Sequence, residues 1–222
     1  MRSAGVIFDV DGVLVDSYRA HFASWQGLAR QHELAVTQPQ FAATFGRTSR
    51  EAIIQLWPDR NLSPAQIAAM DDQKEALFRA ELDDHFPAMD GAAELIVSLA
   101  EAGFALAVGS SGPPENVELV LRQVDPRSLI TARVTGADVT RGKPDPQVFQ
   151  LAAERLGLPP HACVVIEDAA AGVAAAHAAG MPCIGLVSTG RTRAELQGAE
   201  LVVDCLRELT PRRIADLRFR AG

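Results

Sequence analysis

The sequence predicts an α/β fold in which a parallel sheet is sandwiched by helices and a helical domain is inserted after the first strand. Short apolar runs bounded by glycine, proline or polar residues recur along the chain. Longer segments with apolar residues at helical spacing separate the later runs, and this alternation is typical of a parallel sheet covered on both faces. The alternation stops between about Ser17 and about Phe86, which indicates the insertion.

The short apolar runs are predicted as strands because each is too short to form a core helix. In chain order they are Ala4–Phe8, Phe104–Val108, Ala132–Thr135, Cys163–Ile166, Pro182–Val187 and Leu201–Val203. The segments that separate the later runs are predicted as helices from the spacing of their apolar residues. They are Gly91–Ala102, Glu115–Val124, Pro146–Leu156 and Ala170–Ala179.

Residues 17–86 are predicted as a helical domain, and residues 1–16 with 87–222 as the α/β core. The inserted part contains no convincing strand. Its apolar residues fall at helical spacing in Phe22–Leu28, Ala52–Leu56 and Ile67–Phe78. The chain would cross between the two domains near Asp16 and Pro87, and these crossings would act as hinges.

The composition is that of an ordinary globular protein. Of the 222 residues, 48% are hydrophobic and 22% are charged. The net charge is -7, and the sequence contains no basic tract. Nucleic acid is therefore a poor candidate as partner. No apolar run approaches the length of a membrane span or of a signal-peptide core, so we expect no membrane partner. The three cysteines, Cys163, Cys183 and Cys205, lack metal-binding spacing and favour a reducing compartment, so we expect a cytoplasmic protein.

Polar motifs follow several of the predicted strands. Asp9 and Asp11 follow the first strand, Ser110-Ser111-Gly112 follows the second, Lys143 lies in a loop after the third, and Glu167-Asp168 follows the fourth. In an open parallel sheet, ligands bind beyond the carboxyl ends of the strands. We therefore expect these side chains to converge on one edge of the sheet.

Each motif also has a simpler explanation when it is taken alone. The two aspartates could form an acidic turn. A calcium-binding loop is a second alternative, but Gly12 comes too early for it. The serine pair could start a helix, Lys143 could be a surface lysine, and Glu167-Asp168 could be an acidic helix start. The segment Gly185–Thr192 resembles a nucleotide-binding P-loop only weakly, because arginine replaces its lysine and its glycine lies inside a predicted strand.

Together the motifs indicate phosphoryl-transfer chemistry. Carboxylate oxygens suit Mg²⁺, which typically takes one or two carboxylates plus waters and a phosphate oxygen. A serine at a helix N-terminus suits a phosphate oxygen, and a lysine supplies compact positive charge. No single motif makes this prediction, but their combination at one edge does.

The motif set resembles that of the haloacid dehalogenase-like hydrolases, in the branch with a helical cap after the first motif. The motifs Asp9-Val10-Asp11-Gly12, Ser110, Lys143 and Glu167-Asp168 occur in the family's order and span nearly the whole chain. The resemblance implies a Rossmann-like core with an inserted α-helical cap domain. It also implies that Asp9 attacks phosphorus to form an aspartyl-phosphate, while Asp11 protonates the leaving oxygen and then activates the acceptor.

The same resemblance implies a ligand set. Mg²⁺ would be held by the Asp9 carboxylate, the Asp11 backbone carbonyl and Asp168, with Glu167 in or next to the coordination shell. Ser110, the Ser111 N–H and Lys143 would hold the phosphoryl oxygens. An acidic residue at position 11 favours phosphate chemistry over dehalogenation.

Within this family, the chain resembles β-phosphoglucomutase-like enzymes and their sugar-phosphatase relatives. His21 with Trp25 resembles their first cap helix, and Arg47–Glu51 resembles the cap loop that contacts substrate, which makes His21, Trp25, Ser49 and Arg50 candidate substrate residues. His21 could instead be a packed or solvated cap histidine. Gly112-Pro113-Pro114 stands where the mutase has polar side chains for a second phosphate, and Ala169 stands where many relatives have serine.

These observations give three functional hypotheses. The first is a Mg²⁺-dependent phosphatase acting on a small phosphorylated metabolite, most readily a sugar or polyol phosphate, with the cap closing over the site. The second is a β-phosphoglucomutase-type mutase, favoured by Arg50 and His21 and opposed by Gly112–Pro114. The third is a phosphometabolite-binding protein with weak turnover. In each case the partner is a small-molecule phosphate ester, and we expect a monomer or weak dimer.

Overall fold

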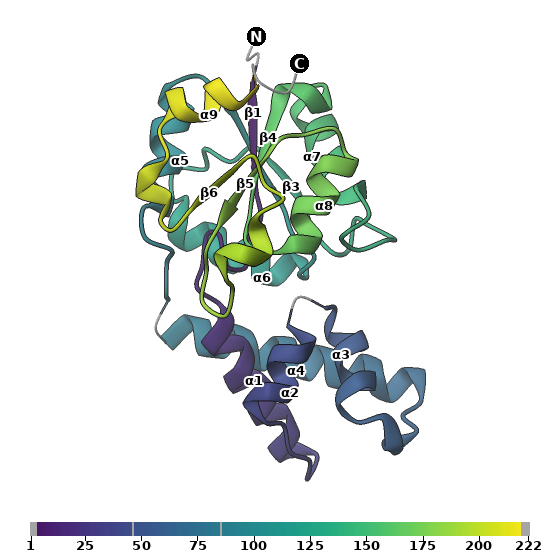
Figure 1. Cartoon of the computed structure of the whole chain (residues 1–222). Coiled ribbons are helices and arrows are strands. Elements are labelled where there is room, and N and C mark those ends of the chain that lie inside the picture. The colour runs from purple at the N-terminus through teal and green to yellow at the C-terminus, as the bar shows by residue number, and fades with distance from the viewer. Residues whose placement is uncertain (1–3, 46, 85, 219–222) are drawn as a thin grey trace. The chain divides into compact units, whose positions relative to one another are not determined.

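The computed structural model describes residues 4–45, 47–84 and 86–218, and its α/β fold agrees with the sequence prediction (Figure 1). The chain separates into two compact units. One contains the residues up to Asp16 and those from Ala88 onward, and the other is Ser17–Pro87. Within the described residues, no helix is both long and apolar enough to cross a membrane.

The first unit is built on a parallel sheet with strand order β3-β2-β1-β4-β5-β6. The strands are β1 (Gly5–Phe8), β2 (Ala105–Gly109), β3 (Ala132–Val134), β4 (Cys163–Glu167), β5 (Cys183–Leu186) and β6 (Leu201–Val203). Each predicted strand is present, with its ends shifted by at most one residue. The strands β1, β2, β4 and β5 are buried along their whole length, which explains their nearly continuous apolar sequences.

Helices cover both faces of this sheet. Figure 1 shows α7 and α8 on one face and α5 and α9 on the other. A further helix, α6, follows β2. The bounds of the five helices are α5 (Ala92–Glu101), α6 (Pro114–Val124), α7 (Gln147–Leu156), α8 (Ala170–Ala178) and α9 (Pro211–Arg218). Ile7 of β1 and Val165 of β4 belong to the same apolar cluster as Phe149 of α7 and Ala176 of α8. The predicted helices are confirmed, whereas α9 was not predicted because half of its eight residues are charged.

Short 3₁₀ helices complete the irregular segments. They are Pro58–Arg60, Pro160–Ala162, Arg193–Leu196 and Leu206–Glu208. The third of them follows the segment that resembled a P-loop. That segment lacks the strand–loop–helix arrangement of a P-loop, because Gly185 lies inside β5 and only this single 3₁₀ turn follows.

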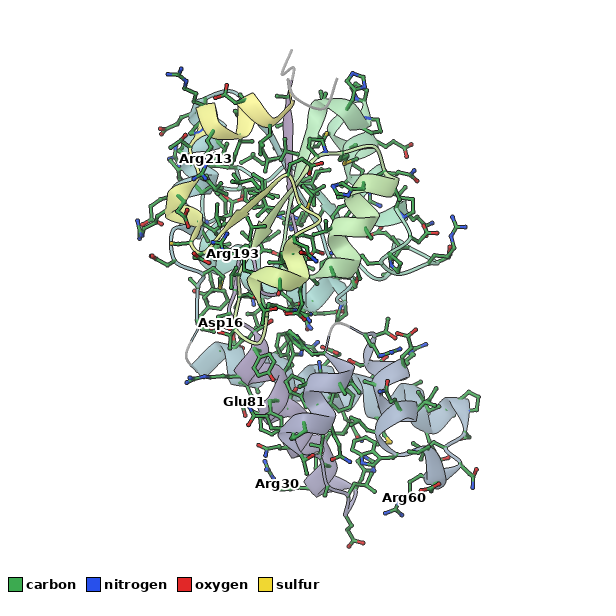
Figure 2. The ribbon with its side chains drawn as sticks, viewed as in Figure 1. Asp16, Arg30, Arg60, Glu81, Arg193 and Arg213 are labelled. Atoms are coloured by element: carbon green, nitrogen blue, oxygen red, sulfur yellow. The ribbon has the colours of Figure 1, made fainter. Side chains whose placement is uncertain are left out.

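Every regular element that the structure describes in the second unit is a helix. These elements are α1 (Tyr18–Gln31), α2 (Gln38–Thr44), α3 (Ser49–Leu56), the 3₁₀ turn named above and α4 (Pro64–Asp84). Trp25 and Leu28 of α1 pack with Ile53 of α3 and Met70 of α4 in one apolar cluster. Figure 2 shows the charged residues Arg30, Arg60 and Glu81 at the surface of this unit.

Capping boxes define helix starts in the second unit. The Thr37 hydroxyl accepts a hydrogen bond from the Gln40 N–H, which starts α2, a helix that the apolar spacing did not predict because it is so short. Thr48 and Glu51 form the equivalent box for α3. The segment expected as a substrate-contacting loop is therefore largely the first turn of a helix, with Ser49 and Arg50 already helical.

Candidate active site

The register of the sheet brings the first, second and fourth strands to a common end. Phe8 lies beside Val108 on one side and beside Ile166 on the other. The Asp9 N–H donates to the Ile166 carbonyl at 2.9 Å, which holds the turn after β1 against β4. The polar residues that follow these strands therefore leave the sheet together, as the sequence predicted.

Lys143 connects two of the buried carboxylates. Its Nζ lies 2.6 Å from Asp9 Oδ1 and 2.7 Å from Glu167 Oε1, and the three side chains are each no more than 10% exposed. The ammonium also lies 4.9 Å from the centre of the Phe149 ring on α7. Lys143 is thus a buried, paired cation and not a surface lysine.

The loop that carries Lys143 is held at both ends by side chains. At its start, the Thr135 N–H and hydroxyl both donate to Asp138, and Arg155 of α7 pairs with the same carboxylate at 2.6 Å. Near Lys143, Gln147 accepts from the N–H groups of Thr140 and Arg141. These contacts explain how a loop without regular structure presents one lysine in a defined place.

Glu167 and Asp168 end β4 and face different partners. The Glu167 carboxylate accepts from its neighbour two residues on, the Ala169 N–H, at 2.7 Å. Gly172 of α8 packs directly on this carboxylate, since a Cβ at that position would lie 1.7 Å from Glu167 Oε1. The helix start after β4 is therefore shaped around Glu167.

Asp168 is held by the loop after β5. The Ser188 hydroxyl donates to Asp168 Oδ2 at 2.6 Å, and Arg191 Nε lies 3.8 Å from the same oxygen. Gly12, with φ +76, closes the other side, because a Cβ there would lie 2.1 Å from this oxygen. Only glycine accommodates both the left-handed backbone and this close approach.

Burial and like charge together raise the pKa of two of these carboxyl groups. Burial raises the pKa of Asp9 well above its usual value, Lys143 lowers it, and Glu167 and Asp168 raise it further. Burial and the Glu167 charge raise the pKa of Asp168 to about 7, against the opposing effects of Ser188 and Arg191. The protein alone thus concentrates more negative charge than its own cations balance, which is the condition that a bound cation would relieve.

The donor set fits a hard divalent cation. Asp9, Glu167 and Asp168 each offer a carboxylate oxygen, and these oxygens lie within 4.8 Å of one another. All three residues are buried. Oxygen-only ligands on a rigid sheet edge suit Mg²⁺ better than a softer transition metal.

The remaining predicted core residues lie at the same edge. Ser110 is 1% exposed, and its hydroxyl accepts from the Gly112 N–H at 3.0 Å. Asp11 contributes to the electrostatic environment of Asp9, and its Oδ2 would lie 3.8 Å from a Cβ at Gly112. Ser111 is exposed, and Gly136 approaches its carbonyl so closely that a Cβ there would lie 2.5 Å away.

Comparison with known proteins identifies the family. A family model described as haloacid dehalogenase-like hydrolase matches residues 4–180. The chain belongs to the haloacid dehalogenase-like hydrolases. It is therefore an enzyme of this family, as the motifs predicted.

Relatives of this hydrolase carry names of phosphatases and of a mutase. Hexitol phosphatase A from Escherichia coli (strain K12) is 34% identical over 210 residues, covering 95% of this chain and 94% of the relative. Validoxylamine A 7'-phosphate phosphatase from Streptomyces hygroscopicus subsp. limoneus is 33% identical over 201 residues, covering 89% and 92%. The crystal structure of β-phosphoglucomutase from Clostridium difficile shares the fold, with a TM-score of 0.86 at 22% identity over 99% of this chain and 98% of that one.

The helical unit of this hydrolase contains a second polar cluster, centred on Lys74 of α4. Lys74 Nζ lies 2.8 Å from His21 Nδ1 and 2.9 Å from Glu75 Oε1, and the lysine side chain is only 2% exposed. The Ser49 hydroxyl donates to the same glutamate oxygen at 2.5 Å. Three of the four predicted cap residues, His21, Ser49 and Trp25, therefore gather around one buried cation.

Aromatic rings complete this cluster. His21 stacks on Phe78 with ring centres 4.0 Å apart and planes 10° apart. The Lys74 ammonium lies 5.0 Å from the Phe78 ring centre and 5.7 Å from that of Trp25. Trp25 is 4% exposed and belongs to the apolar core, so its role in the structure is packing and contact with the cation.

Arg50 does not join this cluster. Its Nε pairs with Asp71 Oδ2 at 2.8 Å, and its side chain is 63% exposed. The structure thus brings together Asp9, Lys143, Glu167 and Asp168 in one unit, and His21, Trp25 and Ser49 in the other. It leaves Arg50 on a surface ion pair.

Sequence reasoning missed four residues that line these two clusters. Lys74 and Glu75 were overlooked because charged residues inside a helical segment suggest a solvated face. The available signal was the spacing of α4, in which Lys74 continues a four-residue repeat with Met70, Phe78 and Leu82, all buried. Ser188 and Arg191 were noticed only as part of a weak P-loop resemblance, and their contact with Asp168 depends on the pairing of β4 with β5.

Proposed function

We propose that this hydrolase is a Mg²⁺-dependent phosphatase that acts on a small phosphorylated metabolite, a sugar or polyol phosphate. One observation carries the proposal: the Asp9 carboxylate is buried in contact with Lys143, within 4.8 Å of oxygens from Glu167 and Asp168. A nucleophile for phosphorus needs a carboxylate that is kept ionised although it is buried. The lysine and a divalent cation together meet that need.

In the proposed reaction, Asp9 is the nucleophile and Asp11 is the general acid and base. A carboxylate oxygen of Asp9 bonds to phosphorus as the bond to the ester oxygen breaks, and Asp11 gives its proton to that leaving oxygen. Asp11 then takes a proton from a water molecule whose oxygen attacks phosphorus. The bond to Asp9 breaks, which releases inorganic phosphate and regenerates the carboxylate.

The other residues of the edge would bind and orient the phosphoryl group. Ser110 is buried, and the Lys143 side chain is 10% exposed and contacts Asp9; we propose that they and the Ser111 N–H hold the phosphoryl oxygens. Asp9, Asp168, the Asp11 carbonyl and Glu167 would hold Mg²⁺. The cation supplies charge that offsets repulsion between the carboxylates and the phosphate.

The substrate class is proposed from the relatives and from the helical unit. The two phosphatases named above act, by name, on a hexitol phosphate and on validoxylamine A 7'-phosphate. We propose that the helical unit is the cap and that its cluster of His21, Ser49, Lys74 and Glu75 contacts substrate hydroxyl groups. Glu75 and Lys74 offer an acceptor and a donor, which suits a polyhydroxy compound.

The proposal is tested by measuring phosphate release from sugar, polyol and nucleotide monophosphates, with Mg²⁺ and with a chelator. We expect turnover of one or more sugar or polyol phosphates that chelation removes, and none with Asp9→Asn. Full activity of Asp9→Asn, or inertness of the folded protein toward the whole panel, would contradict it. Slow turnover together with tight Mg²⁺-dependent ligand binding would favour a phosphometabolite-binding protein instead.

A β-phosphoglucomutase-type mutase is the alternative, in which Asp9 passes its phosphoryl group to a sugar instead of water. A mutase needs a grip on a second phosphate. Gly112-Pro113-Pro114 offers no side-chain donors, and the exposed Arg50 is already paired with Asp71. Incubation with β-glucose 1-phosphate and a trace of the bisphosphate separates the two, because only a mutase forms glucose 6-phosphate faster than free phosphate.

We further propose that the enzyme acts in the cytoplasm, as a monomer or weak dimer. The cysteines Cys163, Cys183 and Cys205 are all free thiols, and burial raises the pKa of the Cys183 thiol well above its usual value. Buried thiols of this kind suit a reducing compartment. Size-exclusion chromatography with light scattering would measure the oligomeric state.

A further inference from the structure

The loop after β5 makes two contacts with a single oxygen of Asp168. Ser188 and Arg191 both approach Asp168 Oδ2, the hydroxyl at 2.6 Å and the guanidinium Nε at 3.8 Å. Neither residue has a role in the proposed reaction. Both are nonetheless withdrawn from solvent, since Ser188 is 7% exposed and the Arg191 side chain 15%.

The backbone of this loop is folded so that both side chains reach the carboxylate. The Arg191 N–H donates to the Ser188 carbonyl at 3.1 Å, which closes a turn of four residues. The loop starts beside Asp168 because β5 pairs with β4, with Gly185 opposite Glu167. The loop is thus placed by the sheet and closed by its own hydrogen bond.

A third contact encloses the same oxygen from the side of β1. The backbone of Gly12 comes so close to Asp168 Oδ2 that a Cβ would lie 2.1 Å from it and 3.0 Å from the Ser188 hydroxyl. Asp168 Oδ2 is therefore surrounded by Ser188, Arg191 and Gly12. All three of these contacts fall on Oδ2, and none of them falls on the second carboxylate oxygen, Oδ1.

Two cationic side chains, Lys143 and Arg191, lie next to the three carboxylates of the acidic cluster. Lys143 bridges Asp9 and Glu167 and lies 2.6 Å and 2.7 Å from their oxygens. Arg191 contributes its charge on the side of Asp168. Each of the three carboxylates thus has a cationic nitrogen within 3.8 Å, and each offers an oxygen to a cluster whose oxygens lie within 4.8 Å of one another.

We propose that Ser188 and Arg191 are positioning residues for the metal site: they hold Asp168 through Oδ2 so that Oδ1 faces the cation. They set the affinity for Mg²⁺ and take no part in bond making or breaking. This explains the arginine in the segment that resembled a P-loop. The inference rests on the proposed Mg²⁺ dependence, but it is tested by metal binding and needs no turnover.

The test is calorimetric titration of the full-length, chelator-stripped protein with Mg²⁺, and with Mn²⁺ as a second probe. We expect Ser188→Ala and Arg191→Gln each to weaken binding about 10-fold or more, because removing a partner of a metal ligand costs about 10–100-fold. Arg191→Lys keeps the charge and is expected to stay within about threefold of wild type. Circular dichroism melting in chelator confirms that the variants are folded.

Arg193→Gln is the matched control, since it removes a second arginine from the same segment. Arg193 pairs with Asp204 at 2.7 Å and donates to the Val202 carbonyl in β6, and its position is labelled in Figure 2. We expect its Mg²⁺ affinity to equal that of wild type.

Three outcomes would overturn the inference. They are wild-type affinity in both Ser188→Ala and Arg191→Gln, tighter binding in Arg191→Gln, or an equal loss in Arg191→Lys and Arg191→Gln. Tighter binding would mean that Arg191 only repels the cation. If wild type bound neither metal, the proposed Mg²⁺ dependence would fail as a whole, a result distinguishable from all three. If wild type bound metal but released no phosphate, only the proposed reaction would fail.

Discussion

At the scale of single residues, the site shows how surroundings divide similar carboxylates into different roles. Asp9 touches Lys143 and shares the acidic cluster, whereas Asp11 is only partly buried and lies in the turn before Val15. Two aspartates separated by one residue therefore meet different dielectric and charge environments. We propose the deeper one as nucleophile and metal ligand, and the more accessible one as proton carrier.

Asp11→Asn tests this division. We expect phosphate release to fall about 10²–10⁴-fold, the usual contribution of a general acid–base group. Mg²⁺ affinity should change little, because only the Asp11 backbone carbonyl is proposed to bind the metal. Calorimetric titration of Asp11→Asn beside Asp9→Asn measures the difference. Equal loss of metal affinity in both variants would contradict the proposed roles.

Gly172→Ala tests the support of Glu167. In an exposed helix this change would be favourable by about 1 kcal/mol. Here the new Cβ would overlap Glu167 Oε1, so the carboxylate must move and its contact with Lys143 must change. We expect activity to fall about 10²-fold, as for a catalytic group displaced by about 1 Å. Gly142→Ala is the control, because nothing lies within 4 Å of its Cβ, and its activity should match wild type.

At the scale of secondary-structure elements, α4 carries a charged residue within its buried apolar stripe, and the packing around that residue explains how it is accommodated. The buried residues Met70, Lys74, Phe78 and Leu82 recur every fourth position, so a lysine occupies an otherwise apolar stripe. The cost of burying its charge is offset by Glu75, His21 and two aromatic rings. A buried ion pair of this kind usually adds little stability over well-packed apolar residues, which supports the binding role proposed for it.

Lys74→Met tests the energetic part of this argument. The substitution keeps the stem of the side chain but removes the ammonium group that pairs with the mostly buried Glu75 carboxylate. We expect the free energy of unfolding of the helical unit to fall by about 3 kcal/mol. The double variant Lys74→Met with Glu75→Gln should recover much of the loss.

Fluorescence in urea measures this loss directly, since both tryptophans, Trp25 and Trp57, lie in the helical unit. Arg50→Met breaks an exposed ion pair in the same unit and serves as control, with little expected effect. A loss in Lys74→Met no larger than in this control would contradict the argument.

Acid should weaken the ion pair between Lys74 and Glu75. Burial raises the pKa of Glu75, but Lys74 and the Ser49 hydrogen bond lower it more, so the net pKa is lowered from 4.5. A depressed folded-state pKa contributes stability that is present above the unfolded value and is lost as pH falls through the folded value. We therefore expect the urea concentration at the unfolding midpoint of the helical unit to decrease as pH is lowered below about 4.5. The decrease should be smaller in Glu75→Gln. Identical pH profiles for both proteins would refute this.

At the scale of the whole molecule, the two compact units divide the proposed work. The carboxylates proposed to bind metal all belong to the unit that contains the sheet, and the Lys74 cluster belongs to the other. Metal binding alone should therefore stabilise one unit. At 100 times the dissociation constant, a ligand that binds only the folded state adds about 2.7 kcal/mol.

Hydrogen exchange measures which unit Mg²⁺ stabilises. We expect added Mg²⁺ to slow exchange in peptides covering 6–12 and 164–172, which contain the proposed ligands. Peptides from 17–87 should exchange at the same rate with and without the cation. Equal protection of both units by Mg²⁺ alone would contradict a metal site built only from the first unit.

Much of the molecule was predictable from local pattern. The strands and the helices that separate them were identifiable because a parallel sheet buried on both faces needs short apolar runs, and its covering helices need one apolar face. The motifs at Asp9, Ser110, Lys143 and Glu167-Asp168 were identifiable because each follows a strand and belongs to a family pattern. The structure brings oxygens of Asp9, Glu167 and Asp168 within 4.8 Å of one another, with Lys143 in contact with the first two residues and Ser110 at the same edge.

The sequence by itself therefore determined the fold class, the family and the carboxylates and lysine of the candidate site. The tertiary structure decided what surrounds them: the enclosure of Asp168 by Ser188, Arg191 and Gly12, the burial of Lys74, and the pairing of Arg50 with Asp71. The physical reason is that periodicity and motif spacing are local properties of the chain. Contacts between residues far apart in sequence, such as Gly12 with Asp168, exist only once strand pairing has brought their backbones together.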